Sequence, residues 1–318
     1  MNTGNFTFLC RTKIGFGMNG LEHLPFDLAS MGSQKPLVLL DKDAQLGGCT
    51  RTLARTFKES GMTLGICPPL HGDPDTGADR QTLKKFYHLY TDKGFDAVIA
   101  LGTGRVVDLA KALNIAVTLG PDTLKIAGDL PRITQPLAPF AYIPTGMGTG
   151  METHKIARFN NRDFSSRFLA PDLAIIDPEI LTQDTSDTLI NAGLTCLSAC
   201  CEAHVLSGNP PARAYCATGI ELLMENFLPL VNIRADFENT QGKPRDKRTA
   251  ASHLARLAHA SVITGIIAAN CEGLLSIQLG RHLANHCTAS PGQAMALLVP
   301  AILDLMADRT ALGKLALP

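Results

Sequence analysis

The sequence predicts an α/β protein: a doubly wound, Rossmann-like N-terminal domain followed by an all-helical C-terminal domain. In the first half, short apolar runs alternate with stretches whose apolar residues recur at helical spacing, which is typical of a parallel sheet covered by helices. From about Asp177 onward the strand pattern stops and the apolar period becomes about 3.6 residues. We therefore expect a dinucleotide-type domain at 1–177 and a helical domain at 178–318.

Four runs of the first half have the length and the β-branched content of buried strands. They are 36–40, 64–67, 97–101 and 140–143. Amphipathic helices are expected between them, at 50–60 and 80–93. The polar tetrapeptide 160–163 (Asn-Asn-Arg-Asp) then predicts the turn of a β-hairpin, because asparagine and aspartate favour tight turns. Its expected strands are 153–159 and 164–170.

The second half predicts helices separated by proline-rich or polar breaks. These helices are 188–206, 211–231, 247–270, 271–286 and 292–305.

Bulk composition excludes several classes of function. The 318 residues carry 29 basic and 29 acidic side chains, so neither nucleic acid nor an anionic membrane surface has an electrostatic reason to bind. The longest uninterrupted apolar runs are far shorter than the roughly 20 residues of a membrane-spanning helix, and the N-terminus lacks a signal-peptide pattern. Nine cysteines without a small-scaffold pattern indicate reduced thiols. We therefore expect a cytoplasmic protein.

Two features of the first half indicate a nucleotide site. Gly102-Thr103-Gly104 joins a predicted strand to a predicted helix, where glycines let a phosphate approach the backbone and the helix start complements its charge. The same Gly-x-Gly pattern also occurs in tight turns between a strand and a helix that bind no ligand. Asp41 ends the strand 36–40, where a carboxylate can accept hydrogen bonds from an adenosine ribose and repel a 2′-phosphate, favouring NAD over NADP. The same residue could instead cap the next helix.

These turns resemble those of the iron-containing (group III) alcohol dehydrogenases, which have a dehydroquinate-synthase-like fold. The family pattern G-G-G-S-x-x-D-x-A-K is similar to 102–111, including Asp108 and Lys111, and I-P-T-T-x-G-T-G-S-E-x-T is similar to 143–154. The resemblance implies that the first turn holds the pyrophosphate of a nicotinamide dinucleotide and that the second turn also lies where the cofactor is expected. The cofactor-binding residues so predicted are Asp41, Gly102, Thr103, Gly104, Asp108, Thr145, Gly148 and Thr149.

The resemblance continues into 193–203, which is similar to the family's metal-site helix G-M-D-A-L-T-H-A-I-E-A. In the family an aspartate and three histidines hold iron or zinc, which polarises the alcohol oxygen. The family's aspartate falls on Thr195 and its histidines on Ala199, on Ile277 and on Pro291. A one-residue shift of the third position gives Gln278 and restores one histidine at best. We therefore expect conventional metal-dependent alcohol oxidation to be lost, and assign no catalytic or metal-binding residue.

A relocated metal site is an alternative. Cys196 and Cys200 are four residues apart, as are His282 and His286, so each pair shares a helix face and two thiolates with two imidazoles would suit tetrahedral zinc. Buried free cysteines and histidines that cap a helix explain the same residues.

Three functions remain open. The favoured one is a catalytically silent relative that still binds NAD(H), as a partner of an active enzyme. The others are an active NAD-dependent alcohol or aldehyde oxidoreductase using a relocated metal or none, and a folded remnant with neither property. The resemblance also implies self-association. Because family members continue for several helices, we expect a C-terminally shortened member with a more open substrate side.

Overall fold

The computed structural model describes residues 5–42, 44, 48–70, 80–124, 133–160, 162–181, 185–239, 247–271 and 273–315. Its contacts form two compact units: an α/β unit, Arg11–Gln183, and a helical unit, Met1–Cys10 with Asp184–Pro318. This division differs from 1–177 and 178–318 chiefly in the first ten residues. They group with the helices because Leu9 N donates to Asn270 Oδ1 (2.7 Å), and because the rings of Phe8 and Tyr215 stack 5.5 Å apart.

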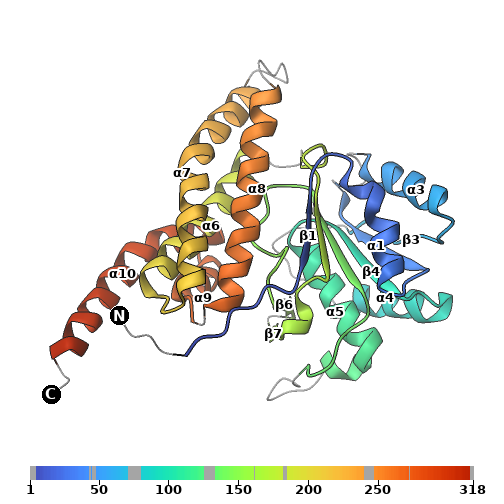
Figure 1. Ribbon diagram of the computed structural model, residues 1–318, viewed down its shortest axis with the longest axis horizontal. Helices are drawn as coiled ribbons and strands as arrows, with labels where there is room; N and C mark the ends of the chain where they lie inside the picture. Colours follow the sequence, from blue (N-terminus) through green and yellow to red (C-terminus); the bar gives the residue numbers. More distant parts are fainter. Residues whose placement is uncertain are drawn as a thin grey trace. The chain divides into compact units, whose positions relative to one another are not determined.

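The α/β unit is built on a six-stranded sheet of order β1-β8-β5-β4-β2-β3, in which every pair of neighbours is parallel (Figure 1). The expected parallel sheet is therefore confirmed. The two strands that sequence patterning missed, β1 and β8, pair with each other at one edge. The strands are β1 Lys13–Phe16, β2 Pro36–Leu40, β3 Gly65–Ile66, β4 Ala97–Gly102, β5 Phe140–Pro144 and β8 Leu173–Ile176.

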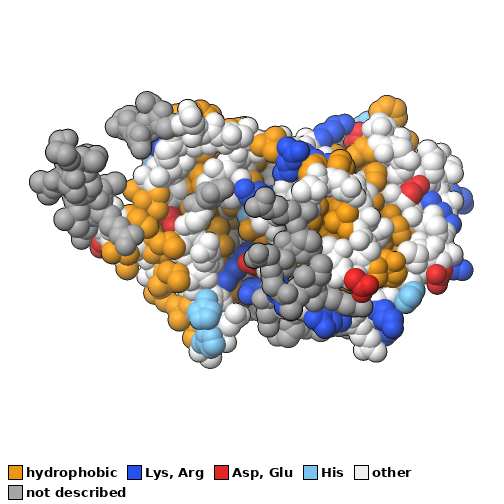
Figure 2. All heavy atoms as spheres, turned by 90° about the horizontal axis from the view of Figure 1, so that it is seen from below, with side chains coloured by type: hydrophobic (Ala, Val, Ile, Leu, Met, Phe, Trp, Pro, Cys, Tyr) orange, Lys and Arg blue, Asp and Glu red, His pale blue; other side chains and the backbone are white. Residues whose placement is uncertain are grey.

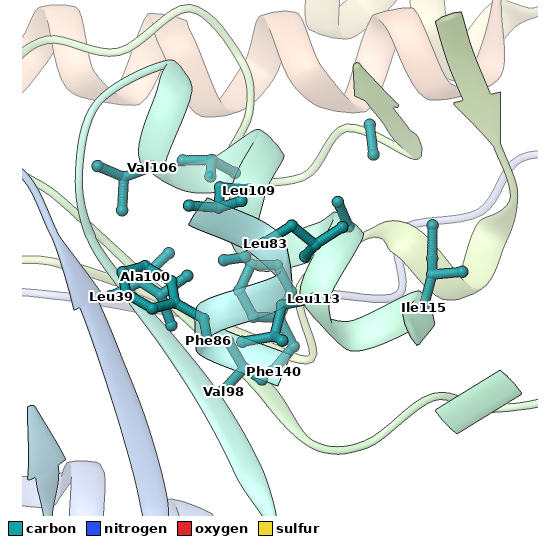
Figure 3. Close-up of a cluster of buried hydrophobic side chains, with 14 of the residues drawn as sticks. Leu39, Leu83, Phe86, Val98, Ala100, Val106, Leu109, Leu113, Ile115 and Phe140 are labelled. Carbon is teal, nitrogen blue, oxygen red and sulfur yellow. The ribbon is translucent and has the colours of Figure 1, made fainter. Parts of the chain in front are cut away.

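Helices cover both faces of this sheet, as a doubly wound fold requires. Two hydrophobic clusters lie on opposite faces, because successive residues of a strand point to opposite sides. One cluster joins Leu39, Val98 and Ala100 to α4 (Arg80–Lys93) and α5 (Arg105–Leu119), as Figure 3 shows. The other packs the alternate strand residues against α1 (Leu24–Ser30) and α3 (Cys49–Ser60). Burial on both sides explains the continuous apolar strand sequences.

The expected hairpin is present, with corrected bounds. Its strands β6 (Ile156–Phe159) and β7 (Arg162–Ser165) are antiparallel, and Asn160 takes a positive φ of 51° at the turn. The second strand therefore starts at Arg162, two residues before the expected 164–170. Most of the remainder of that range forms a short 3-10 helix, Arg167–Leu169, in which the N–H of Phe168 donates to the side chain of Ser166.

The helical unit consists, among the described residues, of five α-helices. Two of them run past their expected ends: α7 continues beyond 231 and α10 beyond 305, with Pro229 and Pro300 inside them. The helices are α6 Ser186–Leu206, α7 Pro210–Asn239, α8 Lys247–Asn270, α9 Leu275–Ala284 and α10 Pro291–Leu315.

Helix α6 forms the centre of this unit and contacts α7, α8, α9 and α10. Glycines allow its closest approaches: a Cβ atom at Gly193 would lie 2.2 Å from the ring of Phe227 on α7. By length and hydropathy α6 could span a membrane, which the sequence analysis overlooked, but 56% of its apolar window is buried inside the protein. That burial is typical of a core helix in a water-soluble protein.

The surface of the helical unit carries hydrophobic side chains, many of them visible in Figure 2. Helices α9 and α10 contribute four exposed leucines, namely Leu279, Leu283, Leu297 and Leu305.

Candidate functional site

Three strand ends of the α/β unit meet at one edge of the sheet. Leu40 of β2 pairs with Leu101 of β4, and Gly102 pairs with Pro144 of β5. The residues that follow these strands are therefore neighbours: Asp41, the first glycine turn (102–104) and the second glycine turn (145–150). The carboxyl edge of parallel strands is where open α/β sheets bind ligands.

The first glycine turn has the geometry of an anion-binding turn. Gly104, with φ of 34°, precedes α5, and no side chain caps this helix start. A Cβ atom at Gly104 would meet nothing within 4 Å, so the backbone there is open to a ligand. At Gly102, by contrast, a Cβ atom would lie 2.2 Å from Asp41 Oδ2, so glycine is required to bring the turn against Asp41. The arrangement suits a phosphate group.

Asp41 is bonded directly to this turn. Its Oδ2 accepts the N–H of Thr103 (3.1 Å), and its Oδ1 accepts the N–H of Ala44 (2.7 Å). The second bond is local, to an N–H three residues further along the chain. Together the two bonds fix the orientation of the carboxylate at the turn. Its contact with a ribose stays a prediction.

The second glycine turn is buried and presents an unpaired hydroxyl. Thr145 is 1% exposed, and its Oγ1 has no hydrogen-bond partner among the residues that the structure describes. Gly148 and Gly150 take positive φ values of 83° and 92°, which side chains rarely adopt. Thr149 between them is half-buried. An orphaned buried hydroxyl is a group that a ligand can satisfy.

Asp108 and Lys111, one helical turn apart on α5, contact the hairpin. Asp108 Oδ1 accepts the N–H of Arg158 (2.9 Å). The Lys111 ammonium is 1% exposed and donates to the carbonyls of His154 (2.8 Å) and Ile156 (2.9 Å). The sequence resemblance marked both residues but did not indicate these partners, because they are backbone groups more than 40 residues away.

The residues of the two turns fit a nicotinamide dinucleotide. An uncapped helix start with an open glycine suits the pyrophosphate, a carboxylate ends the adjacent strand, and Thr145 offers a buried hydroxyl.

The residues that the resemblance places at the family's metal positions do not fit a metal. Thr195 Oγ1 donates to Asn191 O (2.7 Å), Ala199 is a buried methyl group, and Ile277 is half-buried. Beside Pro291, Gly292 N donates to Asn191 Oδ1 (2.8 Å), and a Cβ atom at Gly292 would lie 2.1 Å from Asn191 O. The start of α10 therefore packs directly against α6 beside Asn191 and Thr195.

The two pairs proposed as a relocated metal site lie in different surroundings. Cys196 and Cys200 are fully buried, and Cys200 Sγ lies 3.6 Å from Thr264 Oγ1. Burial raises the pKa of the Cys200 thiol to about 12, which disfavours the thiolate that a metal needs. His282 and His286 are exposed, with ring centroids 4.9 Å apart. Within the described ranges, no group of three or more His, Cys, Asp or Glu side chains could hold a metal.

Glu202 has a role that sequence analysis missed. Its carboxylate is fully buried and accepts the N–H groups of Leu275 (2.7 Å) and Ser276 (2.9 Å). These groups start α9, whose own N-cap, Leu274, makes no side-chain bond. Glu202 therefore caps one helix from another. The available signal in the sequence was a carboxylate within a largely apolar stretch, with no lysine or arginine close by.

Comparisons with known proteins identify the family of this chain. The model of the iron-containing alcohol dehydrogenase family matches residues 11–178. The NAD-dependent methanol dehydrogenase of Bacillus methanolicus is 26% identical over 219 residues, and the 4-hydroxybutyrate dehydrogenase of Cupriavidus necator is 26% identical over 223. Each alignment covers 67% of this chain, which spans 56% of the length of either relative.

Solved structures show the same fold. An iron-containing alcohol dehydrogenase from Thermotoga maritima superposes with a TM-score of 0.76 at 19% identity, covering 96% of this chain and 80% of that one. Sulfoacetaldehyde reductase from Bifidobacterium kashiwanohense, solved in complex with NAD+, gives 0.75 at 17% identity, covering 94% and 76%. The family model accounts for more than half of the sequence, and the fold agrees with it over nearly the whole chain. The chain therefore belongs to the iron-containing alcohol dehydrogenase family.

Proposed function

We propose that this oxidoreductase-family protein binds NAD(H) at the carboxyl edge of its sheet and does not carry out conventional metal-dependent alcohol oxidation. The observation that carries the proposal is the start of α5: no side chain caps it, and the backbone at Gly104 is open. A dinucleotide phosphate there would receive the N–H groups of the helix start. Bound NAD+ supplies the hydride acceptor of this family's chemistry.

The names of two relatives support this cofactor, since one is an NAD-dependent dehydrogenase and another was solved with NAD+. In this chain Gly102, Thr103 and Gly104 would hold the pyrophosphate. Asp41 would accept from the ribose and repel a 2′-phosphate, which favours NADH over NADPH. Thr145, Gly148 and Thr149, from the second glycine turn, would line the other side of the cofactor site. Asp108, also assigned to the cofactor by resemblance, is bonded to the hairpin.

The second part of the proposal rests on the helical unit. Thr195, Ala199 and Pro291 supply no metal-binding atoms at the family's ligand positions, and the Thr195 hydroxyl is committed to Asn191. Without a Lewis acid, the alkoxide-like charge that develops during alcohol oxidation loses its main stabilisation. The protein would then act as an NAD-binding partner of an active enzyme in the cytoplasm, with a small alcohol or aldehyde as the substrate of that enzyme.

The test is a fluorescence titration with NADH and with NADPH, using wild type and two alanine variants at opposite ends of α5. Gly104→Ala and its matched control Gly120→Ala both place a methyl group at a positive φ with nothing within 4 Å. Each should lower stability by about 1–2 kcal/mol through backbone strain. We expect the dissociation constant of NADH to rise at least tenfold in Gly104→Ala alone, because that methyl group occupies the phosphate position.

Equal NADH binding by wild type and Gly104→Ala would contradict the proposed site. A parallel assay measures NAD+ reduction with methanol and 4-hydroxybutyrate, with and without added iron or zinc. We expect binding without turnover, and turnover stimulated by either metal would overturn the metal-free part of the proposal.

A further inference from the structure

The segment that leaves the second glycine turn is bonded to α5 at every second residue. The carbonyls of His154 and Ile156 accept from Lys111, and the N–H of Arg158 donates to Asp108. Backbone groups two residues apart in a strand point to the same edge. The opposite edge faces β7, as the bond from Ser166 N to Lys155 O shows. Lys111 and Asp108 therefore hydrogen-bond to the backbone edge of β6 that faces away from β7, in the way that a neighbouring strand would.

This pairing places a charged group deep in the protein. Burying an ammonium without partners costs several kcal/mol, so a lysine that is 1% exposed must be held by well-placed acceptors. Two of the acceptors of Lys111 are backbone carbonyls of one short segment. The bonds consequently fix that segment against α5 more tightly than apolar packing would, because charged hydrogen bonds are short and directional.

The hydrogen bonds of Asp108 and Lys111 to 154–158 form a linkage between the two glycine turns. The first turn forms the start of α5, and the second turn runs directly into the segment that Lys111 holds. At the sheet, the turns begin side by side through the pair Gly102 and Pro144. The linkage adds a second point of attachment beyond the sheet. A ligand that lies across both turns needs them at a set separation before it binds.

We propose that Asp108 and Lys111 are positioning residues, which hold the second glycine turn against α5 so that both turns are ready to receive one dinucleotide. The dinucleotide part of this inference rests on the proposed function. Asp108 then acts through Arg158 rather than by touching the cofactor.

The full-length Lys111→Met variant tests the proposal, because methionine keeps the length of the chain and removes the donors. Hydrogen exchange should become faster across 145–160 and stay unchanged at 102–105 and in the helical unit. The dissociation constant of NADH should rise about tenfold. Lys85→Met, the same change at an exposed lysine of α4, is the control and should match wild type.

Asp108 gives a second test that does not depend on a buried lysine. Asp108→Ala removes the acceptor for Arg158 N and should act in the same direction as Lys111→Met. Asp108→Asn keeps an oxygen at that place and should restore slow exchange and NADH binding close to wild type. In double variants, Lys111→Met and Thr145→Val should be less than additive in NADH affinity, whereas Lys111→Met and Gly104→Ala should be additive.

Unchanged exchange across 145–160 in both Lys111→Met and Asp108→Ala would overturn the positioning role. So would faster exchange spread evenly over the whole α/β unit, because that result indicates general destabilisation. Wild-type protein that does not bind NADH would contradict the proposed function, while the exchange data would still decide whether these residues hold the turn.

Discussion

At the scale of single residues, the buried carboxylate of Glu202 shows how a charged side chain of one helix can serve another helix. Glu202 lies on α6, and its bonds go to the start of α9. A carboxylate that accepts two N–H groups at a helix start satisfies donors that have no partner within the helix. The residue is therefore explained by helix capping.

Glu202→Gln tests this role. The amide keeps one acceptor oxygen but turns an NH2 group toward the N–H of Leu275 or Ser276, leaving buried donors facing each other. We expect a loss of about 2–4 kcal/mol in the free energy of unfolding, measured with urea. Glu225→Gln is the control: Glu225 is exposed and 3.7 Å from Arg256, so its loss should cost less than about 1 kcal/mol. Equal effects of the two variants would rule out the cap.

Single residues also show what could be predicted locally. Gly104, Gly148 and Gly150 stand where the chain adopts positive φ, so their spacing in the sequence already located the turns. Lys111 resembles any helical lysine until its partners are known. His154 and Ile156 accept through backbone groups, which leave no trace in the sequence.

At the scale of elements, α6 and α10 approach each other closely at Gly292. Gly292 N donates to Asn191 Oδ1, and no room exists for a Cβ atom at Gly292. Within α6, Thr195 Oγ1 donates to the carbonyl of Asn191. The backbone of α10 thus lies against the backbone of α6, and a hydrogen bond from Gly292 joins the two helices.

Gly292→Ala should separate these helices. The added methyl group would overlap a backbone carbonyl, which cannot move aside as a flexible side chain can. We expect the variant to lose about 2–3 kcal/mol of stability, seen as a lower midpoint of thermal unfolding. Gly15→Ala, where the nearest atoms are 3.9 Å away, should change the midpoint little.

The same unfolding experiment tests whether the folded protein binds a metal. A chelator should leave the wild-type midpoint unchanged, since a bound metal would stabilise the folded state by mass action. A midpoint that falls on chelation, or a Gly292→Ala variant as stable as wild type, would contradict a junction held by hydrogen bonds.

Elements also differ in how far their sequences predict them. Strands β2, β4 and β5 are buried on both faces and were recognised from continuous apolar runs. Strand β1 (Lys-Ile-Gly-Phe) is largely exposed at the sheet edge and has no such run. Helices α7 and α10 contain Pro229 and Pro300, and both run past the ends at 231 and 305 that periodicity predicted.

At the scale of the whole molecule, both units bury thiols whose ionisation is suppressed. Burial raises the pKa of Cys67 in the α/β unit and of Cys200 in the helical unit, each from 9.0 to about 12. Between these values the folded protein keeps protons that the unfolded chain releases. The contribution of these thiols to the free energy of unfolding is therefore complete below pH 9. It is lost as the pH rises from 9 toward 12, by up to about 1.4 kcal/mol per pH unit for each thiol.

Urea unfolding under reducing conditions at pH 7, 9 and 10.5 checks this expectation. The free energy of unfolding should fall between pH 9 and 10.5. Cys67→Ala and Cys200→Ala should each show a shallower fall, whatever they cost at pH 7. The exposed Cys287, replaced in the same way, should leave the slope unchanged. If none of the variants alters the dependence of the free energy of unfolding on pH, these thiols do not cause the loss of stability at alkaline pH.

The sequence by itself determined the alternation of strands and helices, the glycine turns and the helical second half, because apolar periodicity and the backbone freedom of glycine are local properties. The tertiary structure alone decided that β2, β4 and β5 bring Asp41, Gly102 and Thr145 to one edge. It also decided that Asp108 and Lys111 hydrogen-bond to the backbone of the hairpin and of the residues just before it. Strand order and bonds to distant backbone groups have no local pattern, so they are settled only when the chain is folded.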